Sequence, residues 1–170
     1  MRFALALLAV GALLSAQTRS RKAHEHGSAK VNIAFESAAG SPKGEIEFEA
    51  PADSVIGFEY EAKSAADKAK QSVALNMLKT RFAEMVIFPA TAACKLTNTS
   101  AKVEARQEQH SEVHAKFDVE CAKSLAGTGI RFGFKKVFPK IHDVDVALLA
   151  GEQQLSLDVE DDKGVLKIAK

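Results

Sequence analysis

The chain has 170 residues and an almost even balance of charge, with 23 Lys and Arg against 22 Asp and Glu. Such a balance supplies no basic field for nucleic acid or for acidic membrane surfaces. A chain of this length can bury one hydrophobic core, so we expect a single folded domain.

The N-terminus has the pattern of an export signal. Met1-Arg2 precedes an apolar run over residues 3–14, and small residues follow. This run is shorter than the about 20 apolar residues that a membrane-spanning helix needs. We therefore expect residues 1–16 to be a cleaved signal peptide, with no membrane insertion after cleavage. An uncleaved anchor is the alternative.

The chain contains two cysteines, Cys94 and Cys121. In an exported protein a single pair of this kind predicts a disulfide. A thiolate metal site is the alternative, but it needs reducing conditions and more ligands.

The first half of the chain predicts an arm, a hairpin and a helix. Residues 17–28 are polar and aperiodic, as in a flexible arm. Residues 31–36 and 46–50 alternate between apolar and polar side chains around a loop with Gly40 and Pro42, which indicates two paired strands. A helix then begins after Ser64, a good N-cap, and its apolar stripe is Leu75, Leu78, Phe82 and Met85.

The second half predicts a similar order. The clearest strand covers residues 111–121, where the odd positions from Val113 to Cys121 are apolar and the even positions are polar. A strand over residues 101–106 precedes it. Residues 124–138 suggest a second helix, and residues 144–148, 155–159 and 165–169 suggest further strands.

This order predicts an α+β fold. We expect two β-hairpin-plus-helix halves, about 29–98 and 99–170, in one domain over residues 29–170. Their antiparallel sheets would carry the helices on one face, with one disulfide.

The five histidines are the only distinctive chemical set, and imidazole is a preferred zinc ligand. His24 and His26 are two residues apart, so on an extended segment both could reach one ion. The alternative is a solvated arm. His110 and His114 lie about 13 Å apart along a straight strand, so either His110 sits in the preceding turn and the two share an ion, or each pairs with Glu112 or with the arm. The alternative is two solvated histidines on a polar sheet face.

His142 lies on the apolar side of its strand, and a half-buried structural histidine is the alternative to a ligand there. Asp143 and Asp145 on the opposite face could be hard ligands or a solvated rim. No phosphate-binding loop, nucleophile elbow or helix-borne histidine pair is present, so we expect no enzymatic activity.

Several short motifs occur in an order that resembles a known family, the periplasmic zinc-uptake proteins of the ZrgA type, formerly a domain of unknown function. They span the chain after the export signal: His24-x-His26-Gly27, Pro51, Gly57-Phe58-Glu59, Ala93-Cys94-Lys95-Leu96, Cys121, Phe134, Phe138-Pro139 and Gly151-Glu152-Gln153.

The resemblance implies a periplasmic protein that binds zinc and helps deliver it to an inner-membrane, ABC-type uptake system. Family members carry a long loop rich in His and Asp where this chain has only residues 104–110, and a histidine where this chain has Tyr60. Both departures remove ligands. The metal ligands we expect are His24, His26, His110, His114 and His142. The alternative function is an exported interaction module that has lost metal binding.

Overall fold

A computed structural model describes residues 26–105 and 110–170. Within these ranges the chain forms mostly strands, in the following order: β1 (Ser28–Phe35), β2 (Lys43–Pro51), α1 (Ala52–Val55), α2 (Ala65–Met85), β3 (Val86–Ile87), the 3-10 turn η1 (Ala90–Ala92), β4 (Cys94–Ala105), β5 (Ser111–Cys121), β6 (Gly129–Phe132), β7 (Asp143–Ala150), β8 (Gln153–Glu160) and β9 (Val165–Lys167).

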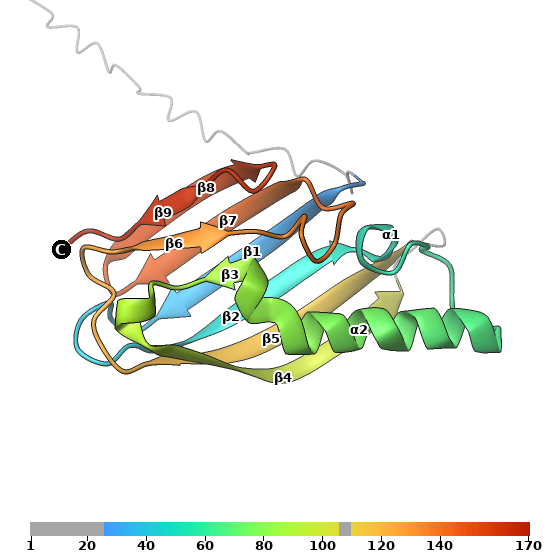
Figure 1. Cartoon of the computed structure of the whole chain (residues 1–170), viewed down its shortest axis with the longest axis horizontal. Helices are drawn as coiled ribbons and strands as arrows, with labels where there is room; N and C mark the ends of the chain where they lie inside the picture. Colours follow the sequence, from blue (N-terminus) through green and yellow to red (C-terminus); the bar gives the residue numbers. More distant parts are fainter. Residues whose placement is uncertain (1–25, 106–109) are drawn as a thin grey trace, which may run out of the picture.

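A six-stranded sheet with the order β4-β5-β2-β1-β7-β8 forms one layer (Figure 1). Neighbouring strands are antiparallel except β1 and β7, which are parallel and pair from Ser28 opposite Asp143 to Phe35 opposite Ala150. The β1–β7 pair thus joins the first strand of the described chain to a strand from its last third.

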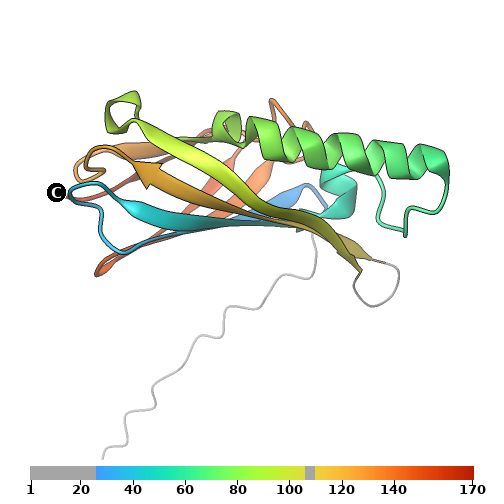
Figure 2. The same cartoon turned by 90° about the horizontal axis from the view of Figure 1, so that it is seen from below.

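A three-stranded sheet, β3-β6-β9, and helix α2 lie on one side of the large sheet (Figures 1 and 2). The core fills the space between the two layers. The ring of Phe82 on α2 stacks on Phe117 of β5 at a centroid distance of 3.9 Å. The ring of Phe134, two residues after β6, stacks on Phe48 of β2 at 5.8 Å, so aromatic contacts join the large sheet to α2 and to the segment that follows β6.

Helix α2 begins as its sequence predicts. The Ser64 hydroxyl accepts a hydrogen bond from the backbone N–H of Asp67 at 3.0 Å, which satisfies one of the unpaired donors of the first turn. The same hydroxyl donates to the Asp67 carboxylate at 2.6 Å, and this bond is the main reason that the pKa of Asp67 lies below its usual value. The buried stripe of the helix faces the large sheet and consists of Ala74, Leu78, Phe82 and Met85.

The expected α+β class is wrong. The described residues are 46% strand and 20% helix and form two sheets, instead of antiparallel sheets with helices packed on one face. The physical reason lies in residues 124–138, which we expected to form a second helix and which contain β6 and turns.

A glycine and an apolar pattern that repeats every two residues explain why the helix predicted for this segment does not form. Gly127 has a φ of +76°, which a helix does not allow. Ile130, Phe132 and Phe134 are all buried, so the apolar pattern alternates as in a strand. Ile130, Phe134, Val137 and Phe138 also fit a helical stripe, and a short apolar run does not distinguish the two patterns.

The strands predicted on either side of this segment are present, and the alternation in β5 is confirmed: Val113, Ala115, Phe117, Val119 and Cys121 are buried. The assignment of residues 29–170 to one domain of two similar halves stays a prediction. Among the described residues, no helix combines the length and apolar character that a membrane crossing requires.

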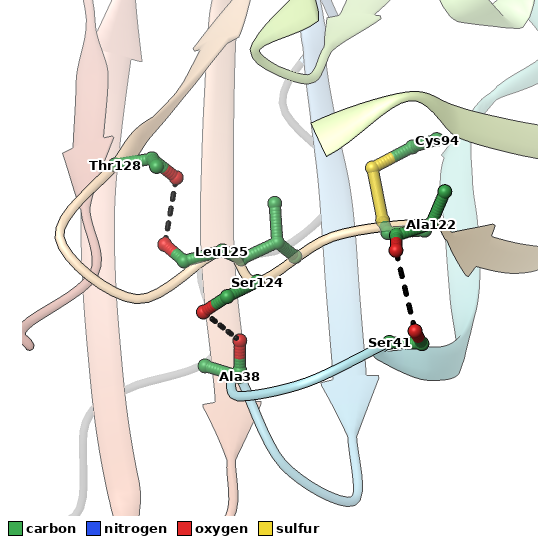
Figure 3. Close-up of a disulfide and its surroundings, with 8 residues drawn as sticks. Ala38, Ser41, Cys94, Ala122, Ser124, Leu125 and Thr128 are labelled. Atoms are coloured by element: carbon green, nitrogen blue, oxygen red, sulfur yellow. Dashed lines mark hydrogen bonds between the residues drawn. A yellow bond between two sulfur atoms is a disulfide. The ribbon is translucent and has the colours of Figure 1, made fainter. Parts of the chain in front are cut away.

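The expected disulfide joins Cys94 to Cys121, which lie opposite each other where β4 begins and β5 ends. Side-chain hydrogen bonds fix the loops around it (Figure 3): Ser41 donates to the carbonyl of Ala122 at 3.2 Å, and Ser124 donates to the carbonyl of Ala38 at 3.1 Å. The bridge therefore ties the edge strand β4 to β5 at one end of the large sheet.

Candidate metal centre

The described histidines lie at the other end of the large sheet. His26 precedes β1, His142 precedes β7, and His110 and His114 lie at the start of β5. The starts of β1, β5 and β7 lie at the same end of the sheet as the last residues of β2, β4 and β8. This follows from the strand directions: β2 runs antiparallel to β1 and β5, β4 runs antiparallel to β5, and β8 runs antiparallel to β7. Strand direction thus gathers segments that are far apart in the sequence.

Three side chains at this end form what we call the strand cluster: Glu49, Glu112 and His114. One ligand atom from each lies within 4.8 Å of the other two. Glu49 of β2 pairs directly across from His114 of β5, and Glu112 lies two residues before His114 on the same strand. Two residues along a strand share one face, so the pairing of β2 with β5 brings all three together.

Glu112 distinguishes this cluster from a solvated polar surface. It is only 2% exposed, and its Oε2 atom lies 3.2 Å from Nε2 of His114. A buried carboxylate is costly unless positive charge or hydrogen bonds compensate it. An ion between the carboxylates and the imidazole would supply such charge.

The donor set fits zinc, because imidazole nitrogen and carboxylate oxygen are both zinc ligands. Glu104 of β4 provides a further carboxylate, whose Oε2 atom lies 3.6 Å from Nε2 of His114. Two exposed lysines neighbour these acids: Lys102 contacts Glu104 at 2.6 Å, and Lys30 lies 3.7 Å from Glu49.

A second group, which we call the loop cluster, consists of His26, Asp53, Glu59 and His110. Glu59 is at its centre, because Nδ1 of His26 lies 3.5 Å from one carboxylate oxygen and Nδ1 of His110 contacts the other. The Glu59 side chain is 14% exposed. Asp53 lies 3.9 Å from His26, but Lys140 binds both oxygens of Asp53 at 2.8 and 3.0 Å.

The turn before β1 holds His26 in this position. The Gly27 N–H donates to the hydroxyl of Ser54 on α1 at 3.0 Å. Gly27 has a φ of +86°, and a Cβ atom there would lie 2.3 Å from Nε2 of His142. Only glycine therefore lets the chain turn between α1 and the His142 ring.

The structure separates the expected ligands into three places. His26 and His110 meet at Glu59, whereas His114 belongs to the strand cluster. His142 lies in a hollow of about 200 Å³, which His26 and three carboxylates also line: Asp143, Glu160 and Asp161. His24 lies outside the described residues.

The sequence did not single out Glu49, Glu59 or Glu104 as ligands. Glu112 had a signal, because it stands between His110 and His114 on one face of the strand. In the sequence, Glu59 stands out only as the last residue of the family motif Gly57-Phe58-Glu59. Glu49 and Glu104 join the strand cluster through the registers of β2 and β4 against β5, which no local pattern reveals.

The comparison with protein families decides the assignment. Residues 23–168 match the family model described as "ZrgA family zinc uptake protein". The chain belongs to the ZrgA family. A search of curated proteins found no match. The ZrgA assignment covers both clusters, connects the chain with zinc uptake, and confirms the resemblance seen in the sequence motifs.

Proposed function

We propose that this protein captures zinc in the periplasm, without catalysing a reaction, and helps deliver it to an inner-membrane uptake system. One observation carries the proposal: Glu49, Glu112 and His114 place their ligand atoms within 4.8 Å of one another, and Glu112 is buried. Zinc would be the cargo of this cluster, held by the imidazole of His114 and the two carboxylates.

The strand cluster is suited to reversible binding. His114 is partly exposed, and Glu49 and Glu104 are within reach of lysines that can pair with them when zinc leaves. An ion held by one imidazole and carboxylates at the end of a sheet can be reached from outside, which delivery to a second protein requires.

The experiment is a zinc titration by calorimetry of residues 17–170 and of variants in the strand cluster. His114→Ala and Glu112→Gln should each weaken zinc binding at this site at least about tenfold, because each removes a ligand. Asp118→Asn is the matched control, since Asp118 lies on the same face of β5, is exposed and is outside the cluster. Unchanged affinity in both cluster variants would disprove this assignment of the site.

Delivery is tested in cells. A strain that lacks the gene should grow more slowly than its parent when a zinc chelator limits the metal. The wild-type gene should restore growth, and the His114→Ala, Glu112→Gln double variant should not. Equal growth with and without the gene would contradict a role in uptake.

A further inference from the structure

One row of side chains crosses the large sheet at the strand cluster. Residues that pair directly on neighbouring strands point to the same face of a sheet. The order of the strands β5, β2, β1, β7 and β8 (Figure 1) and their registers place five residues in this row, on the face that carries the cluster: His114, Glu49, Lys30, Asp145 and Asp158. The row therefore contains two ligands of the cluster, then one lysine, then two aspartates.

Lys30 has acids on both sides. Its ammonium nitrogen lies 3.7 Å from Oε1 of Glu49, and its side chain is 54% exposed. On the other side, Asp145 is its direct neighbour on β7, and Asp158 follows on β8. Neighbouring strands are about 4.8 Å apart, so the flexible four-carbon side chain of Lys30 can reach either Glu49 or Asp145.

The lysine on the other side of the cluster is placed differently. Lys102 of β4 lies directly opposite His114, but its ammonium group contacts Glu104 at 2.6 Å. Glu104 is not one of the three residues whose ligand atoms lie within 4.8 Å of one another. Of these two lysines, Lys30 is therefore the one that a zinc ion has to displace from a ligand of the strand cluster.

We infer that Lys30 sets how tightly the strand cluster holds zinc, because its charge switches between Glu49 and Asp145. The inference rests on the proposed function. Without zinc, Lys30 offsets the negative charge of Glu49. When zinc binds Glu49, the two positive charges of the ion repel the ammonium group, and Lys30 turns to Asp145 and its neighbour Asp158. Zinc thus competes with a cation of the protein, which lowers the zinc affinity and favours release to a second protein.

Zinc titration by calorimetry of residues 17–170, at about 0.15 M salt, tests the first half of the switch. Lys30→Gln should tighten zinc binding about threefold, the scale of an exposed ion pair, because it removes the competing charge. Lys30→Arg keeps the charge and should not tighten binding. Lys43→Gln is the matched control: Lys43 pairs with Glu120 at 2.8 Å on the same face, about 20 Å along β2 from Glu49.

Asp145→Asn tests the second half of the switch. It removes the carboxylate to which Lys30 turns, so it should weaken zinc binding about threefold in the wild type and have no effect in Lys30→Gln. A direct action of Asp145 on the ion would appear in both backgrounds. Two strand spacings, about 10 Å, separate Asp145 from Glu49, and salt at this concentration screens exposed charges over that distance. At about 1 M salt the effect of Lys30→Gln should shrink as well.

Unchanged or weaker zinc binding in Lys30→Gln would overturn the inference, and so would the same effect of Asp145→Asn in both backgrounds. Both side chains are exposed, so these variants should fold as the wild type does. Glu112→Gln separates the inference from the proposed function. If Glu112→Gln weakens zinc binding and Lys30→Gln leaves it unchanged, the cluster binds zinc and the switch is absent. If the wild type binds no zinc, both are wrong.

Discussion

Glu112 and His114 lie two residues apart on β5, with a carboxylate oxygen 3.2 Å from an imidazole nitrogen and Glu112 buried. The side chains that follow them on the same face, Lys116, Asp118 and Glu120, are exposed. A buried acid beside an imidazole therefore occurs at the histidine end of the strand and is absent from the rest of that face.

Zinc should stabilise the folded protein. A ligand that binds only the folded state at 100 times its Kd raises the free energy of unfolding by about 2.7 kcal/mol. We expect a corresponding rise in Tm on zinc addition, measured by thermal denaturation, and its reversal by a chelator. The rise should be smaller in His114→Ala than in the Asp118→Asn control. The same rise in both variants would argue against the strand cluster.

Removal of the disulfide should reduce stability and leave zinc binding intact. Cys94 and Cys121 are 27 residues apart in the sequence, and closing a loop of that size stabilises by about 3–4 kcal/mol in the chain-entropy model. The Cys94→Ser, Cys121→Ser variant should lose this amount in urea denaturation. Its zinc affinity should stay within about threefold of wild type, because distant sites act independently.

A reducing agent supplies the control for the disulfide. It should destabilise the wild-type protein and have no effect on the double serine variant. A large loss of zinc affinity on reduction would show that the two ends of the sheet are coupled, against this prediction.

Phe82 should be the most sensitive position on α2. Its ring is 1% exposed and stacks on Phe117, so Phe82→Ala leaves a cavity between the helix and the large sheet. The expected loss of stability is about 3–5 kcal/mol. Val73 on the same helix is 60% exposed, and Val73→Ala should change stability by less than about 0.5 kcal/mol. Similar losses in both variants would contradict the packing of α2.

The Glu84–Arg81 pair should make a small contribution to stability that depends on pH. Hydrogen bonds from Arg81 at 2.8 Å hold the pKa of Glu84 below its usual 4.5. A carboxyl with a lowered pKa stabilises the folded state above its usual pKa, and this contribution is lost as the pH falls through the lowered value.

The Tm difference between wild type and Glu84→Gln should therefore be larger at pH 7 than near about pH 3. Because both side chains are exposed, the difference should be small and should shrink in high salt. A difference that grows as the pH falls would contradict the sign of the effect.

The sequence alone determined the features that depend on local patterns. Alternation predicted the buried face of β5, spacing of three and four predicted the stripe of α2, and Ser64 predicted its start. The two cysteines predicted the disulfide, and ordered motifs predicted the family. The local pattern failed at residues 124–138, because a short apolar run fits both a helix and a strand and only the contacts of Ile130 with β9 and of Phe134 with Phe48 distinguish them.

The tertiary structure decided which ligands meet. From the sequence, His26 and His110 are 84 residues apart, and nothing local relates either of them to Glu59. The parallel pairing of β1 with β7 and the antiparallel pairing of β2 with β5 bring the histidines to one end of the sheet, and the β2–β5 register places Glu49 opposite His114. A metal site depends on distances of a few ångströms between ligand atoms, and such distances follow from strand order and register, which long-range packing determines.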